Sequence, residues 1–156
     1  MKILFVCLGN ICRSPLAEGI LLAKAAEKGL DIEVESAGFE SYHINEPPDE
    51  RAVKICDHYG IDIKENKCRL FTVEDFDKFD RIYVMDSGNY RDVQYFSRHE
   101  EDMQKVSYLL SVIDGKNQAV PDPYYGGEEG FENVYQLINN ACGKIVEKIE
   151  QKQLLD

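Results

Sequence analysis

Residues 6–15 read Val6-Cys7-Leu8-Gly9-Asn10-Ile11-Cys12-Arg13-Ser14-Pro15. The run at 3–6 before them is short and wholly apolar, which predicts a buried strand. After them, apolar residues at 16, 20 and 23 recur at helical spacing. We therefore expect a helix from about Pro15 to Lys28, with Ser14 as its cap and Gly29 at its end.

The segment between this strand and this helix is a short loop that favours anion binding. Several main-chain N–H groups converge in such a loop, beside the positive end of the helix dipole. Gly9 allows a tight turn, and the planar guanidinium of Arg13 matches two phosphate oxygens. Cys7 opens the loop, and the donors that hold a phosphate also stabilise a thiolate. These residues predict a sulfur nucleophile at the floor of a phosphate site, and hence phosphoryl transfer to sulfur.

The pattern C-x5-R-[ST] after a first strand resembles the protein tyrosine phosphatases, and the longer form C-L-G-N-I-C-R-S-P resembles the low-molecular-weight family. The resemblance implies a three-layer α/β sandwich, in which a four-stranded parallel sheet is flanked by helices. It also implies hydrolysis of phosphotyrosine and small aryl phosphates through a phosphocysteine, without a metal or other cofactor. The substrate-binding residues expected in the loop are Leu8, Gly9, Asn10, Ile11, Cys12 and Ser14.

Strand and helix patterns alternate along the rest of the chain. Further strands are expected near 32–35, 82–85 and 106–110, and helices near 49–59, near 89–98 and from about 128 onward. This alternation predicts a parallel sheet covered on both faces, with ligands beyond the carboxyl ends of its strands. His43, Asp86 and Asp122 each end or follow one of these strands, so we expect them at the same sheet edge as Cys7.

The segment Val120-Pro121-Asp122-Pro123-Tyr124-Tyr125 holds an aspartate between two prolines. Pro123 forces Asp122 into an extended conformation, which suits a rigidly placed proton donor. A nearby thiolate and phosphate dianion would favour its protonated form. A solvated Asp-Pro turn is the alternative, but the D-P-Y sequence is similar to the acid loop of the family. We therefore predict Asp122 as general acid and then base, Cys7 as nucleophile and Arg13 as the residue that binds phosphate and stabilises the transition state.

The remaining candidates have supporting roles. For Tyr124 and Tyr125 the resemblance implies an aromatic wall that stacks on phosphotyrosine, and partly buried packing in the loop is the alternative. His43 corresponds to a position where family members carry a polar residue near the loop, so it is either a substrate-binding residue or a surface histidine. Asp86 either supports the loop or caps the next helix, and Cys12 either fills the loop interior or closes a reversible disulfide with the nucleophile.

Asn10 and Ser14 are expected to orient the loop and to donate hydrogen bonds to the Cys7 thiolate. Ser14 can do this and also serve as a helix cap. The three cysteines at 56, 68 and 142 are expected to be core or incidental residues.

Composition limits the function classes. The 156 residues predict one domain, 1–156, and the net charge of −11 opposes nucleic acid and anionic membrane surfaces. An odd count of 5 cysteines with no C-x-x-C pair argues against a disulfide framework or a zinc site, and favours a reducing, cytoplasmic setting. The expected partners are a phosphotyrosine protein or small aryl phosphate, with phosphate and other oxyanions as product or inhibitors. The physiological substrate and the oligomeric state stay open.

Two other functions are compatible with a C-x5-R loop. Arsenate reductases of similar fold share it, but they relay electrons through two closely spaced cysteines in the middle of the chain. Here the mid-chain cysteines, Cys56 and Cys68, are far apart and form no such pair. A non-catalytic phosphate-binding module would keep the loop and lose the nucleophile or the acid, yet both are present.

Overall fold

The computed structural model describes residues 1–125 and 127–152, without the side chains of residues 125, 127 and 128. A parallel sheet in the order β2-β1-β3-β4 is formed by β1 (Lys2–Val6), β2 (Glu33–Ala37), β3 (Arg81–Val84) and β4 (Val106–Tyr108). The last residue of β1, Val6, pairs with Ala37 and with Val84, so neighbouring strands end at the same level. The predicted four-stranded parallel sheet is confirmed, and the loops after its strands open at one edge.

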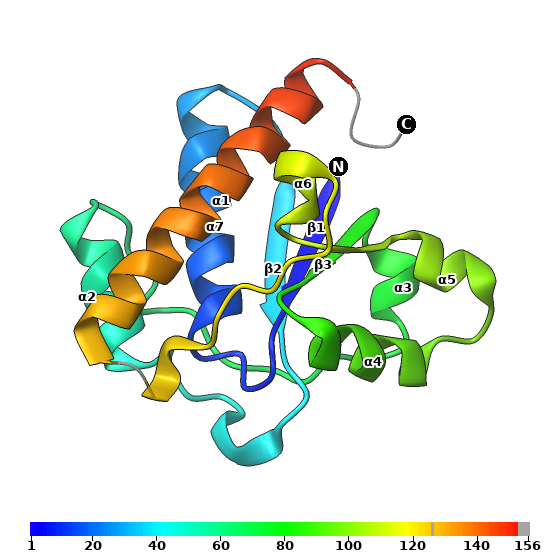
Figure 1. The fold of residues 1–156 in the computed structure, drawn as a ribbon, viewed down its shortest axis with the longest axis horizontal. Coiled ribbons are helices and arrows are strands. Elements are labelled where there is room, and N and C mark those ends of the chain that lie inside the picture. The colour runs from blue at the N-terminus through cyan, green and yellow to red at the C-terminus, as the bar shows by residue number, and fades with distance from the viewer. Residues whose placement is uncertain (126, 153–156) are drawn as a thin grey trace.

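Helices cover both faces of the sheet (Figure 1). One face carries α1 (Arg13–Glu27), α2 (Glu50–His58), α6 (Ser111–Asp114) and α7 (Gly127–Glu150), and the other carries α3 (Asp75–Lys78), α4 (Ser87–Phe96) and α5 (Glu100–Gln104). Two 3-10 turns, η1 (Ser41–His43) and η2 (Pro123–Tyr125), follow β2 and precede α7. None of the described helices combines the length and apolar character needed to span a bilayer.

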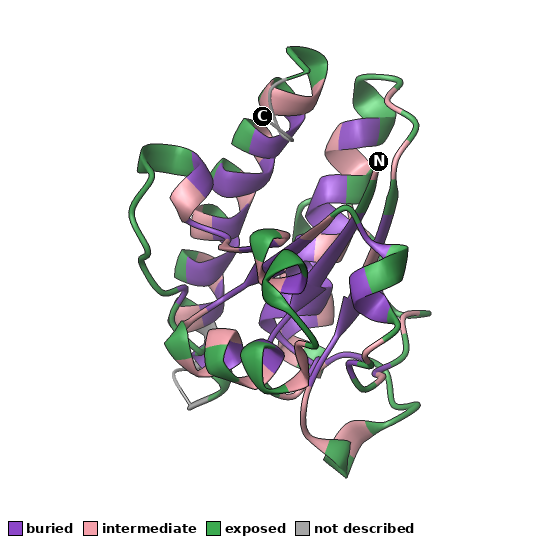
Figure 2. Cartoon of the chain, turned by 90° about the vertical axis from the view of Figure 1, so that its right-hand side faces the viewer, coloured by how far each residue is buried: buried purple, intermediate pink, exposed green. Residues whose placement is uncertain are grey.

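The alternation of side chains along β1 produces two separate cores. Ile3 and Phe5 pack with α1 and α7 on one face, whereas Leu4 and Val6 pack with α3 and α4 on the other. Figure 2 shows the strands as a buried layer between helices whose outer surfaces are exposed. Because both faces of β1 are buried, its sequence is continuously apolar, as expected for a central parallel strand.

The start of α1 differs from the prediction. The helix begins at Arg13 with Cys12 as its N-cap, so Ser14 lies inside the first turn, and the expected Ser14 cap is wrong. The reason is that the Ser14 hydroxyl bonds to Asn10 and Cys7 instead of capping the helix. At the other end Gly29 has a φ of 65°, and Leu30 N–H donates to Ala25 O, which confirms the predicted stop.

Several short elements were not predicted: α5, α6, η1 and η2. Each spans five residues or fewer, too few for a helical period to be visible in the sequence. The longer predicted elements are present with ends shifted by a few residues. The structure therefore agrees with the predicted order of strands and helices and with the position of the four strand-end loops.

Candidate active site

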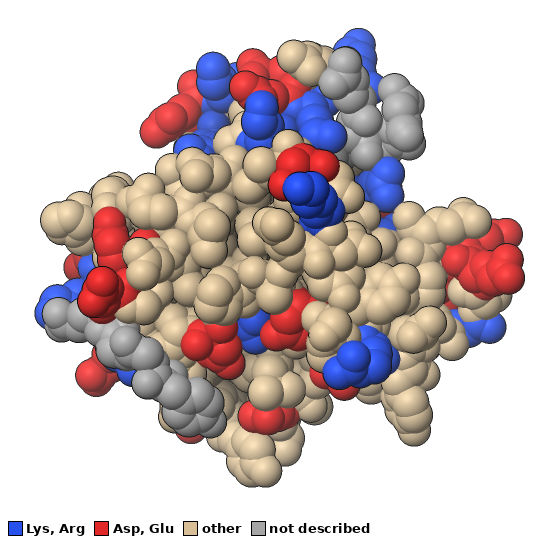
Figure 3. All heavy atoms as spheres, viewed as in Figure 1, with Lys and Arg blue, Asp and Glu red and all other residues tan. Residues whose placement is uncertain are grey.

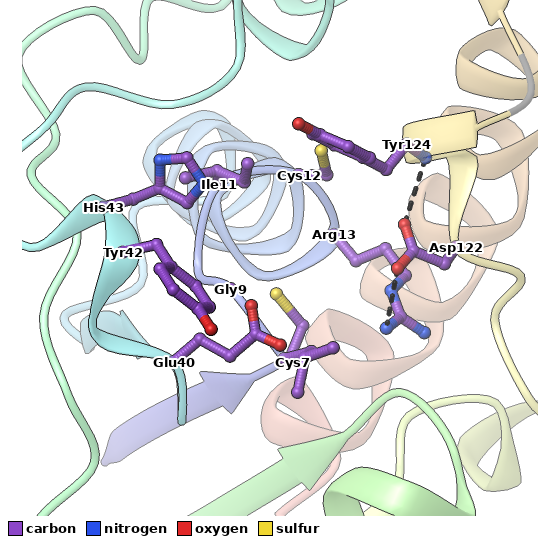
Figure 4. Close-up of a pocket in the computed structure, with 11 residues that line it drawn as sticks. Cys7, Gly9, Ile11, Cys12, Arg13, Glu40, Tyr42, His43, Asp122 and Tyr124 are labelled. Atoms are coloured by element: carbon purple, nitrogen blue, oxygen red, sulfur yellow. Dashed lines mark hydrogen bonds and ion pairs between the residues drawn. The ribbon is translucent and has the colours of Figure 1, made fainter.

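A pocket of about 340 Å³ opens at the carboxyl edge of the sheet (Figure 4). Nine of its lining residues were predicted from the sequence: Cys7, Leu8, Gly9, Ile11, Cys12, Arg13, His43, Asp122 and Tyr124. They come from the loop after β1, from η1 and from the segment around η2, which are distant in sequence. The expectation that strand-end residues converge is met for Cys7, His43 and Asp122.

The Cys7 thiol lies at the base of this pocket, and a chain of side-chain hydrogen bonds beneath the loop positions it. Asn10 Nδ2 donates to Ser14 Oγ (2.8 Å) and to Ser36 Oγ (3.0 Å), while Asn10 Oδ1 accepts from Arg69 N–H (3.0 Å). Because Ser14 Oγ already accepts from Asn10, its own proton is available to Cys7 Sγ at 3.0 Å. The expected contact of Ser14 with Cys7 is present, but the expected donation from Asn10 to Cys7 is wrong, because its amide donates to the two serines. Both residues lie beneath the loop and do not line the pocket, where they were expected to bind substrate.

The main chain of the loop faces the pocket with unpaired donors. Among the described residues, the N–H groups of residues 8–12 donate to no main-chain oxygen, and no side chain caps the N-terminus of α1. The carbonyl groups, in contrast, are bonded outward: Leu8 O accepts from Phe39 and Glu40 N–H, and Ile11 O from Asp49 N–H. The loop thus turns its acceptors away from the pocket and leaves its donors for an anion.

A glycine in the next loop makes this arrangement possible. A Cβ on Gly38 would lie 2.8 Å from Asn10 N and 2.9 Å from Asn10 Cβ. Neither atom belongs to the far end of a flexible side chain. The segment after β2 can therefore pack directly on the phosphate loop only because residue 38 has no side chain.

The Arg13 guanidinium is almost fully buried, with 2% of the residue exposed, and it has fixed partners. Its Nη1 donates to Asp86 Oδ2 (2.8 Å) and to Val120 O (2.8 Å), and its Nη2 lies 3.8 Å from Asp122 Oδ2. Asp86 also accepts from Asn89 N–H through Oδ1 (2.9 Å). Both proposed roles of Asp86 therefore hold, since one oxygen caps α4 and the other orients Arg13.

This pairing sets the charge state of Asp86. Burial would raise the pKa of the Asp86 carboxyl, but the hydrogen bonds from Asn89 and Arg13 outweigh it and hold the pKa below its usual range.

The pKa of the Cys12 thiol is shifted in the opposite direction. Burial, and then the charges of Asp49 and Cys7, raise the pKa of its thiol. Cys12 therefore stays protonated and neutral beside the pocket.

Asp122 stands at the opposite side of the pocket from η1. Its Oδ1 accepts from Tyr124 N–H (3.0 Å), and 39% of its side chain is exposed. The second oxygen, Oδ2, is turned toward Arg13 (Figure 4). The carboxyl thus has one oxygen held by the η2 turn and one directed at the guanidinium over the phosphate loop.

The other predicted side chains are less closely tied to the loop. His43 lines the pocket, with its Nδ1 2.7 Å from Glu46 Oε2, and Tyr124 forms part of the opposite wall. The side chain of Tyr125 lies outside the described residues. Sequence reasoning missed Glu40 and Tyr42, which both line the pocket. Their position between the second strand and His43 is the signal that could have found them.

Among the described residues, no group of three or more His, Cys, Asp or Glu side chains is arranged to hold a metal ion. All five cysteines are free, and Cys56, Cys68 and Cys142 are buried, as expected for core residues. The pocket itself is lined by the Cys7 thiol, the Arg13 guanidinium and the Asp122 carboxyl.

Comparisons with known proteins agree with this geometry. The family "Low molecular weight phosphotyrosine protein phosphatase" matches residues 2–154. The low molecular weight protein-tyrosine-phosphatase YfkJ of Bacillus subtilis is 38% identical, over 99% of each chain. A protein tyrosine phosphatase structure from Entamoeba histolytica, with Hepes in its active site, has a TM-score of 0.91 at 37% identity over 99% of each chain.

A third similar protein carries a phosphate-like ligand. Vibrio vulnificus Wzb, solved in complex with benzylphosphonate, has a TM-score of 0.83 and 30% identity, over 94% of this chain and 97% of that one. The matches extend from the first strand to the last helix and therefore include the loop after β1 and the Asp122 segment. On this evidence the chain belongs to the low molecular weight phosphotyrosine protein phosphatase family.

Proposed function

We propose that residues 1–156 form one phosphatase domain that hydrolyses phosphotyrosine through a phosphocysteine at Cys7. Membership in the family implies phosphorylated substrates and phosphate-type ligands. The observation that carries the assignment of Cys7 is its position: the sulfur lies under unpaired main-chain donors and 3.0 Å from the Ser14 hydroxyl, which can donate to a thiolate. These donors favour the thiolate and also bind the phosphoryl oxygens.

In the first step, Cys7 Sγ attacks phosphorus and the bond from phosphorus to the phenolic oxygen breaks. Arg13 binds two equatorial oxygens of the phosphoryl group, and its contact with Asp86 keeps the guanidinium aimed at the loop. Asp122 gives its proton to the departing phenolate oxygen, so that tyrosine leaves as a neutral phenol. The phosphoryl group is then bonded to sulfur and Asp122 is ionised.

In the second step, water attacks the phosphocysteine and the bond from phosphorus to sulfur breaks. Asp122, now a carboxylate, takes a proton from the water, and inorganic phosphate is released. The Ser14 hydroxyl donates to Cys7 Sγ as it leaves, which stabilises the departing thiolate. The enzyme returns to its starting charge state without any cofactor.

The substrate class follows from the depth and the walls of the pocket. Cys7 is only 3% exposed, so a phosphoryl group must extend well beyond the substrate backbone to reach it. Tyr42 and Tyr124 line the mouth and can stack on an aryl ring. A phosphotyrosine meets both requirements, and phosphoserine is too short. The benzylphosphonate bound by the Vibrio protein supports an aromatic ligand of this kind.

Hydrolysis of p-nitrophenyl phosphate by the wild type and two variants tests the assignment. Cys7→Ser should abolish turnover, and Asp122→Ala should lower kcat by about 10²- to 10³-fold, with a larger loss for poorer leaving groups. Asp114→Ala is the matched control. Its carboxylate likewise accepts the N–H two residues on, from Lys116, but it does not line the pocket. Equal losses in the Asp114 and Asp122 variants would contradict the proposed acid.

Two further measurements on the wild type separate the competing functions. Oxidation of protein thiols that depends on arsenate, without phosphate release, would identify a reductase. Binding of phosphate without hydrolysis by the wild type would identify a binding module. The free thiols support a reducing, cytoplasmic setting, which a cysteine nucleophile requires.

A further inference from the structure

The active-site pocket contains more negative than positive side chains. Among the described residues, Arg13 is the one Lys or Arg that lines it, while Glu40 and Asp122 both do. The Arg13 guanidinium is already paired with two carboxylates: its Nη1 lies 2.8 Å from Asp86 Oδ2, and its Nη2 lies 3.8 Å from Asp122 Oδ2. Acidic side chains also lie at the lower middle of the face in Figure 3, where η1 and the loop after β1 lie in Figure 1. Glu40 therefore remains a negative side chain in the pocket even when Asp122 is protonated as the acid, and it opposes the phosphate dianion that Arg13 and the loop N–H groups attract.

Glu40 is the carboxylate in this pocket that the proposed reaction does not use. Its main chain is fixed, because its N–H and that of Phe39 both donate to Leu8 O, at 3.1 and 2.8 Å. Figure 4 shows its side chain directed from the residue before η1 toward the middle of the pocket, beside Tyr42. Within residues 1–125 and 127–152, no hydrogen bond or ion pair is made by its carboxylate.

A cation delivered by the substrate would correct this imbalance. Tyr42 is 78% exposed and lies next to Glu40, so its ring can contact the aliphatic stem or the charged group of a long basic side chain. A Lys or Arg close to the phosphotyrosine would thus find a carboxylate and an aromatic face together. The phosphoryl group would remain with Arg13 on the opposite side.

We propose that Glu40 is a specificity-determining residue that selects phosphotyrosyl segments with a Lys or Arg beside the phosphotyrosine. The basic side chain lies between the Glu40 carboxylate and the Tyr42 ring. This inference rests on the proposed phosphotyrosine phosphatase function.

Three phosphotyrosyl peptides that differ only in the two residues flanking phosphotyrosine, as Lys, Gln or Glu, provide the test. For the wild type we expect kcat/KM to be about fivefold higher for the Lys peptide than for the Gln peptide at low salt. The Glu peptide should be the poorest of the three. The preference should shrink as salt is raised toward 1 M, because Glu40 is only half-buried and the neighbouring Tyr42 is exposed, so ions can screen the pair.

Glu40→Gln should abolish the preference for Lys, and Glu40→Lys should reverse it. Glu50→Gln is the matched control, since it removes the same charge from an exposed position that does not line the pocket. Retention of the full Lys preference in Glu40→Gln, or its equal loss in Glu50→Gln, would overturn the inference. So would a wild type with equal kcat/KM for all three peptides.

p-Nitrophenyl phosphate separates this inference from the function on which it rests, because it has no flanking residues. If the wild type hydrolyses it and still treats the three peptides alike, only the role of Glu40 fails. If the wild type does not hydrolyse it, the phosphatase function itself fails.

Discussion

Replacing Asp86 with asparagine tests the support of Arg13 without changing the size of the side chain. The carboxylate uses both oxygens: Oδ1 accepts from Asn89 N–H at 2.9 Å and Oδ2 accepts from Arg13 Nη1 at 2.8 Å. An amide has one oxygen, so Asp86→Asn must lose one of these bonds. Since asparagine is as good a helix cap as aspartate, the lost partner should be the guanidinium.

The expected cost follows from the burial of Arg13. A hydrogen bond to a charged group contributes about 1.5 to 3 kcal/mol, and the Arg13 side chain is only 3% exposed, so little water can compensate for the lost bond. We therefore expect Asp86→Asn to lower the free energy of unfolding by about 1.5 to 3 kcal/mol at pH 7. Urea unfolding measures this. The control Asp114→Asn should change it by less than about 0.5 kcal/mol, because its single bond to Lys116 N–H needs one oxygen.

The pH dependence gives a second, independent check. The pKa of Asp86 is held below its usual range in the folded protein, against about 3.9 in the unfolded chain. Its stabilising contribution is therefore complete well above pH 4 and is lost as the pH falls through the lower, folded value. The difference between wild type and Asp86→Asn should shrink in acid. A difference that stays constant or grows as the pH falls would refute the assigned pairing.

Three further perturbations test the loop itself. Gly38→Ala would place a methyl group 2.8 Å from Asn10 N, so we expect a loss of about 1 to 3 kcal/mol in urea unfolding together with lower kcat/KM; unchanged values would contradict the contact. Ser14→Ala removes the donor to Cys7 and should lower kcat about 10- to 100-fold. Because the phosphocysteine then breaks down slowly, stopped-flow measurements should show a burst of p-nitrophenol. An unchanged kcat would refute the role of Ser14. Iodoacetamide at neutral pH should alkylate Cys7 before Cys12, whose pKa is raised by burial, and peptide mass spectrometry that found the reverse order would contradict this assignment.

The sheet and the phosphate loop could be predicted because they depend on local patterns. A continuous apolar run at 3–6 ends at a glycine-containing loop, and a helical period follows directly. The parallel topology then places the strand-end loops at one edge, which brought His43 and Asp122 to the pocket. These inferences need only side-chain period and strand direction.

Only part of the network beneath the loop could be predicted, because several of its bonds join residues far apart in the chain. Ser14 was expected to cap a helix and to donate to Cys7, and its hydroxyl does lie against Cys7 Sγ. The Asn10 amide, however, donates to Ser14 and to Ser36, which is 26 positions away, and not to the thiolate. Asp86 binds Arg13 across 73 positions, and no local pattern records that distance. Glu40 was missed because a glutamate in a loop is normally solvated, and only its backbone bonds to Leu8 fix it at the pocket.

Direct detection of the phosphoenzyme tests the central claim most directly. Wild type and Ser14→Ala are mixed with p-nitrophenyl phosphate, quenched within one turnover, digested, and analysed by peptide mass spectrometry. We predict that the peptide containing Cys7 carries one additional phosphoryl group, and that more of it accumulates in Ser14→Ala, where thiolate departure is slower. Turnover with an unmodified Cys7 peptide in both proteins, or with the phosphoryl group on another residue, would contradict the account.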